Sequence, residues 1–158
     1  MFFTTNTFYN TVFFWGETME SLKVQDYMNR RAVKLLPSMP VAEAVERLLL
    51  SKQTGGPVVN SQNELIGFLS EQDCLSQMIT SSYYREQVAR VEDIMKTPVL
   101  SVKGNDSIIE LAQMMIKEKP KVYPVLDESG VLIGSISRSE VLNAIDVQLH
   151  SGYENKKR

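Results

Sequence analysis

The sequence has a single cysteine, Cys74, among its 158 residues. One cysteine excludes an internal disulfide and a cysteine-based zinc cluster, and it points to a reducing compartment. Because Cys74 follows Asp73 on an apolar helix face, we expect it to be packed rather than reactive. Basic residues are not in excess, since 17 Lys and Arg stand against 19 Asp and Glu. This balance offers no field that would attract a phosphate backbone, so nucleic acid is not an expected partner.

Long apolar runs and catalytic signatures are missing as well. No run approaches the roughly 20 apolar residues of a membrane span, so no membrane partner is expected. The sequence has no Ser/His/Asp set, no metal-ligand spacing and no glycine-rich phosphate loop, and its lone histidine, His150, stands near the C-terminus. We therefore predict a cytoplasmic protein that is not an enzyme and holds no metal.

The first 21 residues differ in composition from the rest of the chain. They carry aromatic residues among Thr and Asn, with no basic start of the kind that signal peptides have: Phe2, Phe3, Phe8, Tyr9, Phe13, Phe14 and Trp15. We interpret 1–21 as an aromatic N-terminal arm appended to the module. Whether it is an upstream extension, a disordered arm or a strand docked on a partner stays open.

What the chain does contain is a repeat. Gly67-Phe68-Leu69-Ser70-Glu71-Gln72-Asp73 returns as Gly134-Ser135-Ile136-Ser137-Arg138-Ser139-Glu140, an offset of 134 − 67 = 67 that holds without insertion from Val24/Val91 to Leu75/Leu142. Such self-similarity indicates one supersecondary unit used twice, each copy covering the other's apolar face. We therefore divide the chain into repeat 1 at 22–80, a linker at 81–90, repeat 2 at 91–150 and a basic C-terminal tail at 151–158 that we expect to fray.

Local patterns predict the same elements in both copies. In repeat 1, alternation at 32–35 indicates a short strand, and apolar residues at helical spacing indicate a helix over 41–49. Two strands joined by a polar turn follow at 57–59 and 64–69, and a last helix begins at Ser70. The equivalent segments of repeat 2 lie 67 residues further on. The predicted fold class is α+β, with two β-α-β-β-α units.

The Pro-Val pair that opens the second strand, the Leu-Ile-Gly that closes the hairpin and the Ser-x-x-Asp/Glu at the last helix occur twice. This pattern, over about 22–148, resembles the cystathionine-beta-synthase (CBS) domain, and two in tandem look like a Bateman module. The resemblance implies two repeats packed through their sheets about a pseudo-twofold axis, with two clefts between them. Family members commonly bind AMP, ADP, ATP, S-adenosylmethionine or NAD there. It also implies a free-standing CBS-pair protein, because no enzyme or channel is attached.

Ser70 and Asp73 are the first candidates for ligand binding. Ser70 can cap its helix while the acid favours the positive helix end. The same helix end can also offer N–H groups to a phosphate, and a carboxylate can accept hydrogen bonds from both hydroxyls of a ribose. In that family, the residue at the serine position contacts the phosphate and the aspartate binds the ribose. The resemblance adds Lys121 as a cation that reaches the phosphates, and an adenine slot formed by Val33, Pro57 and Val58.

The second copy departs from the family pattern, because Glu140 replaces the aspartate. Ser137 and Glu140 form a better capping box than Ser70 and Asp73, which favours a structural role. We therefore rank this cleft as a weaker or vacant ribose site. Its expected residues are Ser137, Glu140, Thr97, Val99, Pro124 and Arg138.

Together these features predict a regulatory module that binds an adenine nucleotide in the cleft of repeat 1 and signals to an unknown target protein by conformational change. The alternative is a ligand-free CBS-pair module that serves only for dimerisation or protein interaction. An enzyme acting on nucleotides ranks below both. We expect the two final helices to lie side by side, forming an apolar stripe that a homodimer would cover.

Overall fold

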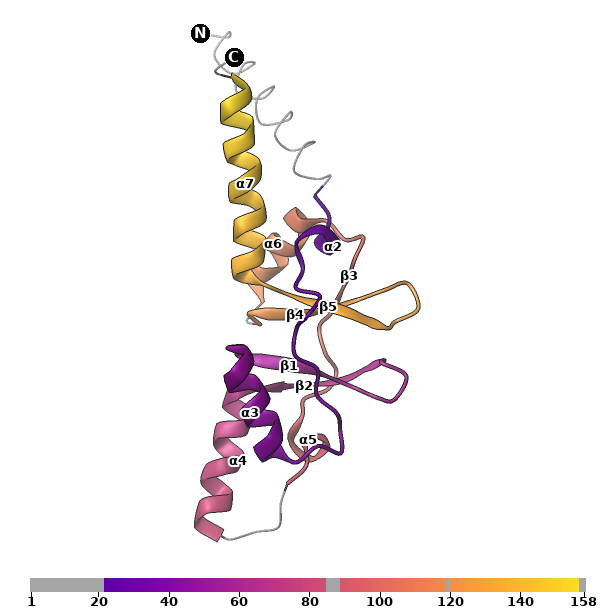
Figure 1. The fold of residues 1–158 in the computed structure, drawn as a ribbon, viewed down its shortest axis with the longest axis vertical. Helices are drawn as coiled ribbons and strands as arrows, with labels where there is room; N and C mark the ends of the chain where they lie inside the picture. The colour runs from indigo at the N-terminus through magenta and orange to yellow at the C-terminus, as the bar shows by residue number, and fades with distance from the viewer. Residues whose placement is uncertain (1–21, 85–88, 119, 157–158) are drawn as a thin grey trace.

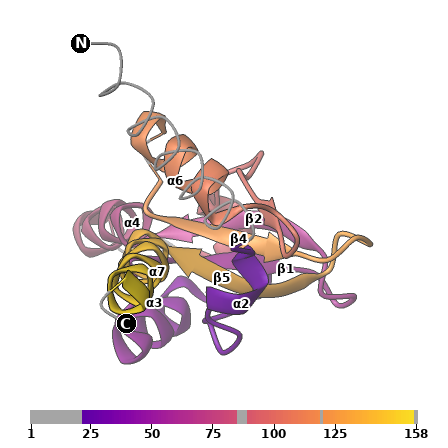
Figure 2. The ribbon, with the colours of Figure 1, turned by 90° about the horizontal axis from the view of Figure 1, so that it is seen from above.

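The computed structural model describes residues 22–84, 89–118 and 120–156, so the predicted aromatic arm lies outside the described residues. Each repeat is built on an antiparallel hairpin: β1 (Gly55–Val59) with β2 (Leu65–Ser70), and β4 (Val122–Leu126) with β5 (Leu132–Ser137). The two hairpins meet at the centre of the molecule (Figure 1). Seen along the long axis, one overlies the other (Figure 2). The α+β class, with repeats packed through their sheets, is therefore confirmed.

Helices cover the outer end of each repeat. Helices α3 (Val41–Ser51) and α4 (Glu71–Tyr84) lie at one end, and α6 (Ile108–Lys117) and α7 (Arg138–Lys156) lie at the opposite end (Figure 1). The last helices of the two repeats, α4 and α7, are thus separated by the sheets. The expectation that they lie side by side is wrong, because each packs on its own hairpin.

The two hairpins share the same register and the same irregularity. Gly55 pairs with Ser70 in the first hairpin, as Val122 pairs with Ser137 in the second. The pairing register of each hairpin shifts at the equivalent position, after residue 58 in the first and after residue 125 in the second. Their turns use a left-handed residue, Asn63 in one and Gly130 in the other, which are also 67 residues apart. The repeat therefore extends to the details of the backbone.

The strand predicted at 32–35 is wrong. In its place the structure has a single parallel bridge between Leu35 and Val58. Leu35 donates its N–H to Pro57 O at 3.0 Å and accepts from Val59 N at 2.9 Å. The next donor of a parallel ladder would be residue 37, which is a proline and has no N–H. In repeat 2 the equivalent element, β3 (Val102–Lys103), pairs with β4 but contains only two residues.

Two helices run further than the sequence patterns predict. Helix α4 continues to Tyr84, into the predicted linker, and α7 continues to Lys156, into the tail that we expected to fray. The linker thus begins as a continuation of α4, and the expected fraying of the tail is wrong up to Lys156. A helix that is already nucleated gains one backbone hydrogen bond for each residue it adds. Over the part of the chain that the structure describes, no helix combines the length and apolarity that a membrane crossing needs.

The first short helix of each repeat packs into the core of the other repeat. Helix α2 (Val24–Tyr27) precedes repeat 1 in the chain, yet Val24 is fully buried in one cluster with Tyr123 and Ile136. Helix α5 (Val91–Ile94) likewise buries Val91 among the core residues of repeat 1. Backbone bonds hold both in place, from Val24 N to Asp106 O at 3.0 Å and from Val91 N to Met39 O at 2.9 Å. Each repeat therefore completes its core with a segment of the other.

The thiol of Cys74 is expected to react slowly. Cys74 is 4% exposed in the core of repeat 1. Burial, and then the nearby carboxylates of Asp73 and Glu71, raise the pKa of this thiol. Because the thiolate is the reactive form, we expect modification by Ellman's reagent at pH 8 to be about tenfold or more slower than that of free cysteine. The rate should rise towards higher pH, and a rate equal to that of free cysteine would contradict this burial.

Candidate functional site

Two clefts lie where the repeats meet, and they are related by the same 67-residue offset. The Asp73 cleft, named here for its carboxylate, has a volume of about 480 Å³. The Glu140 cleft has a volume of about 420 Å³. Thr54 and Lys121 line both clefts, because they stand at the centre, at equivalent positions of the two repeats. Both volumes fall within the roughly 300–1,000 Å³ of typical small-molecule sites.

The Asp73 cleft is built around the start of α4. Asp73 Oδ2 accepts hydrogen bonds from Ser70 N at 3.1 Å and from Ser70 Oγ at 2.7 Å, and Asp73 N donates to Ser70 Oγ at 3.1 Å. This reciprocal pattern is a capping box, so the structural role predicted for both residues is confirmed. The other oxygen, Oδ1, lies 3.2 Å from Nζ of Lys96, whose side chain is 74% exposed. Oδ1 is therefore the Asp73 oxygen whose partner is a solvent-exposed side chain.

The same cleft offers positive potential for an anion. Glu71 N donates to Thr54 O at 2.9 Å and Asp73 N to Ser70 Oγ, while in the described residues the N–H of Gln72 has no partner. That N–H lies at the positive end of a 14-residue helix. Lys121 lines the cleft from repeat 2, and Phe68 presents an aromatic ring from β2. The arrangement can hold a phosphate, two hydroxyls and a flat apolar ring.

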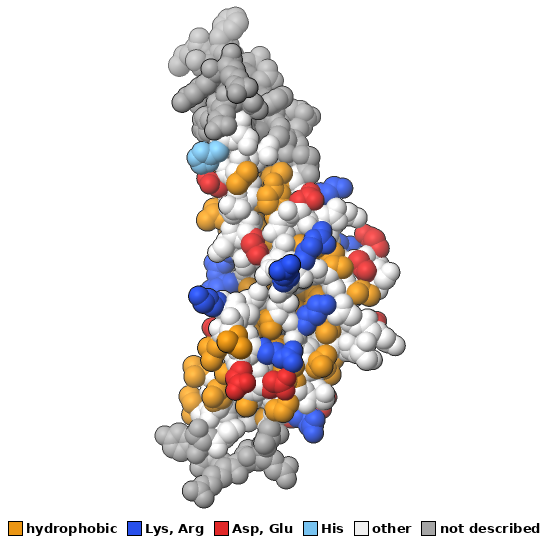
Figure 3. Space-filling model, in the orientation of Figure 1, with side chains coloured by type: hydrophobic (Ala, Val, Ile, Leu, Met, Phe, Trp, Pro, Cys, Tyr) orange, Lys and Arg blue, Asp and Glu red, His pale blue; other side chains and the backbone are white. Residues whose placement is uncertain are grey.

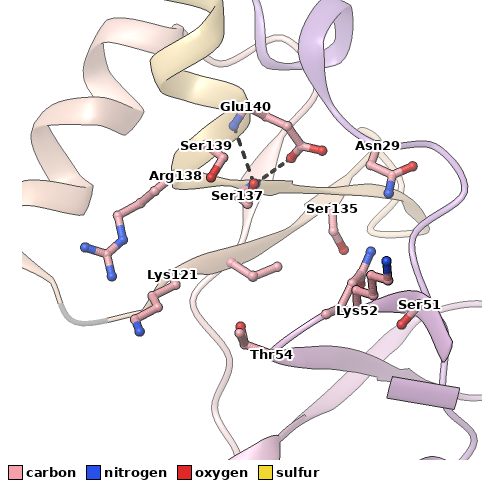
Figure 4. Close-up of a pocket in the computed structure, with 12 residues that line it drawn as sticks. Asn29, Ser51, Lys52, Thr54, Lys121, Ser135, Ser137, Arg138, Ser139 and Glu140 are labelled. Atoms are coloured by element: carbon pink, nitrogen blue, oxygen red, sulfur yellow. Dashed lines mark hydrogen bonds between the residues drawn. The ribbon is translucent and has the colours of Figure 1, made fainter. Parts of the chain in front are cut away.

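The Glu140 cleft repeats the capping box at the start of α7. Ser137 N donates to Glu140 Oε2 at 2.7 Å, and Glu140 N donates to Ser137 Oγ at 3.4 Å (Figure 4). Ser137, Glu140 and Arg138 line this cleft as predicted. Arg138 extends its guanidinium away from Asn29 and Ser135 (Figure 4). The structure thus brings half of the residues predicted for this cleft together.

The remaining predicted residues lie elsewhere. Pro57 and Val58 are fully buried in β1, and Val33 packs beside Gly56, so none of the three lines the Asp73 cleft. In repeat 2 the three residues predicted for a second base slot are also dispersed. Thr97 is exposed, Pro124 is buried in β4, and Val99 lines a separate hollow of about 300 Å³ near the hairpin turns.

The lining residues that sequence reasoning missed include four that lie at the junction of the repeats: Phe68, Lys96, Ser135 and Asn29. A signal existed for two of them, because Phe68 and Ser135 each stand two residues before a capping serine and so share its face of the strand. Lys96 and Asn29 have no comparable signal in their local sequence. They reach the clefts through bridges to the opposite repeat, Lys96 to Phe68 and Asn29 to Ser135.

Known proteins with similar sequences and structures have the same tandem arrangement of two repeats. The CBS domain family matches residues 24–80 and again residues 91–147, so the chain belongs to the CBS-domain family and has the tandem form of a CBS-pair protein. A crystal structure of CBSX2 in complex with AMP is 30% identical, with a TM-score of 0.69 over 81% of this chain and 98% of that one. Another, described as a CBS-pair protein from Arabidopsis thaliana, is 28% identical, with a TM-score of 0.71 over 83% and 98%.

Several curated relatives are longer than this chain. YtoI of Bacillus subtilis is 31% identical over 117 residues, which cover 74% of this chain but 25% of that protein. MK0525 of Methanopyrus kandleri is 23% identical over 124 residues, and they cover 78% of this chain and 63% of that protein. What these relatives do as whole proteins therefore does not carry over to the shared module.

Proposed function

We propose that this protein is a non-enzymatic regulatory module that binds an adenine nucleotide, AMP before ADP or ATP, in the Asp73 cleft. The observation that carries the proposal is the position of the Asp73 carboxylate. It lies at the free N-terminus of α4, beside the ring of Phe68 and opposite Lys121. A ribose on Asp73, a base on Phe68 and a phosphate near Lys121 would use each of these groups. The AMP complex of CBSX2 supports this choice of ligand.

Charge favours a monophosphate in this cleft. Lys96 and Lys121 line it together with Glu71 and Asp73, so its two cations are balanced by two carboxylates. Each further phosphate of ADP or ATP would meet this neutral surface without gaining another cation. S-adenosylmethionine and NAD remain the other adenosine compounds to test. Because the ligand would contact α4 from repeat 1 and Lys121 from repeat 2, its binding would fix the relative position of the repeats, which is a signal that a partner can read.

Ligand-dependent stability tests the proposal. AMP at 100 times its dissociation constant is expected to raise the free energy of unfolding by about 2.7 kcal/mol, because it binds only the folded state. Thermal melts of the full chain with AMP, ATP, S-adenosylmethionine and NADH measure this effect. Liquid chromatography of the same mixtures checks that no compound is consumed. If none of them shifts the melting temperature, the protein is better explained as a ligand-free interaction module.

The α3 and α4 end of the molecule is expected to form a homodimer contact. Leu49 is 65% exposed, Leu75 61% and Ile79 54%, and apolar side chains gather over this end of the molecule (Figure 3). Leu49 and Leu75 line an apolar hollow of about 310 Å³ between α3 and α4. Light scattering should give twice the chain mass of 17.9 kDa. Leu75→Glu should give the monomer, whereas Leu100→Glu, at a site 48% exposed near β3, should not. A monomeric wild type at micromolar concentration would remove this contact.

A further inference from the structure

The Glu140 cleft contains buried polar atoms that have no partner. Ser135 is 3% exposed, and its Oγ makes no hydrogen bond within the residues that the structure describes. The Oε1 atom of Gln53, a residue that lines the same cleft, is buried and unpartnered as well. Buried polar groups in folded proteins almost always have partners, so an orphaned pair in one cleft indicates a place where a ligand completes the bonding. The Asp73 cleft has no such atom among its described residues.

Other polar groups face the same hollow. Asn29 accepts a hydrogen bond from Arg31 N through Oδ1 at 3.0 Å, which turns its amide nitrogen towards the cleft. Glu140 uses Oε2 for Ser137 N, and in the described residues Oε1 has no partner. Figure 4 shows the Ser135 side chain pointing from repeat 2 towards the segment of repeat 1 that carries Lys52. Around the cleft, two acceptors therefore have no partner among the described residues, the buried Gln53 Oε1 and Glu140 Oε1, and Asn29 and Ser135 supply donors.

The two clefts differ in charge and in apolar surface. Ser135 takes the place that Phe68 has in the Asp73 cleft, so no aromatic ring stands there for a base to stack on. Lys52, Lys121 and Arg138 line the Glu140 cleft together with a single carboxylate, Glu140. The positive end of α7, a 19-residue helix, adds to this field. A ligand that suits these groups is an anion rich in hydroxyls and needs no flat ring.

We propose that the Glu140 cleft is a second ligand site, specific for a phosphorylated polyhydroxy compound of the sugar phosphate class, and that it does not recognise a base. The phosphate lies at the open side, near Lys121, Arg138 and the N-terminus of α7. The hydroxyls lie deeper, where they donate to Gln53 and Glu140, and one of their oxygens accepts from Ser135. The proposal does not require AMP binding in the Asp73 cleft, because it concerns the other cleft and another ligand class, although Lys121 lines both clefts.

Ribose 5-phosphate is the probe, titrated by calorimetry into the full chain and into Asp73→Ala. Both proteins are expected to bind it with affinities within about twofold, because Asp73 lies outside the Glu140 cleft. Ribose alone and inorganic phosphate should each bind at least about tenfold more weakly, since each lacks half of the recognised groups. Glu140→Ala removes a charged acceptor, and the affinity for ribose 5-phosphate should fall by about tenfold or more.

Ser135→Ala distinguishes a ligand site from a packing role, because it should raise the stability of the unliganded protein and lower its affinity for ribose 5-phosphate. Without ligand, the variant should melt at a higher temperature than the wild type, since an unpaired buried hydroxyl is removed. Its affinity for ribose 5-phosphate should nevertheless fall by roughly two- to tenfold. Ser151→Ala is the matched control, because Ser151 lies on the exposed part of α7 and should change neither quantity by much.

Three outcomes would overturn the proposal. Ribose 5-phosphate could fail to bind, its binding could disappear in Asp73→Ala, or inorganic phosphate alone could bind as tightly. In each case AMP binding to the wild type is measured separately. A chain that binds AMP but not ribose 5-phosphate contradicts only this site. A chain that binds ribose 5-phosphate in both the wild type and Asp73→Ala, with no added affinity for AMP, contradicts the nucleotide function and leaves this site standing.

Discussion

Asp73→Ala is expected to lower the affinity for AMP about a hundredfold. A carboxylate that accepts from both ribose hydroxyls makes two charge-assisted bonds of roughly 1.5 kcal/mol each, and their loss corresponds to that factor. The stability of the unliganded protein should fall much less, by about 1 kcal/mol or less, because the change removes the acceptor for Ser70, a favourable helix-end charge and an ion pair with the solvent-exposed Lys96. Calorimetric titration with AMP and denaturant melts measure the two effects.

Glu140→Ala is the matched control for this prediction. Both acids hold the backbone N–H of a serine three residues earlier, so both variants lose the same structural contact. Glu140→Ala should therefore cost similar stability while leaving AMP binding in the Asp73 cleft unchanged. Equal losses of AMP affinity in the two variants would show that both clefts hold the nucleotide alike. No loss in Asp73→Ala would leave this acid as a helix cap alone.

Leu69→Ala is expected to cause the largest loss of stability, about 2–5 kcal/mol. Leu69 is fully buried in the core of repeat 1, on the face of β2 opposite Phe68 and Ser70. Truncation removes apolar contacts and leaves a cavity that rigid neighbours cannot fill. For a chain of this size the melting temperature should fall by roughly 5–20 °C. Differential scanning calorimetry of the variant and the wild type measures this loss.

Leu50→Ala deletes the same atoms at a position that is 85% exposed on α3. Its stability should stay within about 0.5 kcal/mol of the wild type. Affinity for AMP in Leu69→Ala, measured well below its melting temperature, should also be preserved, because Leu69 points away from the cleft. Similar losses of stability in Leu69→Ala and Leu50→Ala would contradict the assignment of Leu69 to the core and Leu50 to the surface.

Much of the fold could be predicted from the sequence because the pattern of each helix and strand occurs once in each repeat. The helices over 41–49 and 108–116 and both hairpins were found in this way. The predictions failed where an element depends on pairing with distant residues, which a local sequence pattern does not contain. Alternation at 32–35 predicted a strand, but a strand also needs a partner ladder, and Pro37 ends that ladder after the single bridge at Leu35. The C-terminal ends of α4 and α7 lack the apolar periodicity from which a helix is predicted, so their length could not be predicted.

The candidate site could be predicted only in part, for a similar reason. Ser70 and Asp73 lie within one local motif, and their contacts are local hydrogen bonds over three residues. Lys96 and Asn29 reach their clefts by pairing with the opposite repeat, which no local pattern records. The buried state of Ser135 Oγ depends on the packing of both repeats and likewise leaves no trace in the sequence.

The exchange of the first short helices has a consequence for cooperativity. Unfolding repeat 1 alone would withdraw Val24 from the core of repeat 2, and unfolding repeat 2 would withdraw Val91 from the core of repeat 1. Neither half can melt and leave the other with an intact interior. Although the family recognises two domains along this chain, they form one thermodynamic unit, for which the calorimetric enthalpy and the van't Hoff enthalpy of a single transition should agree.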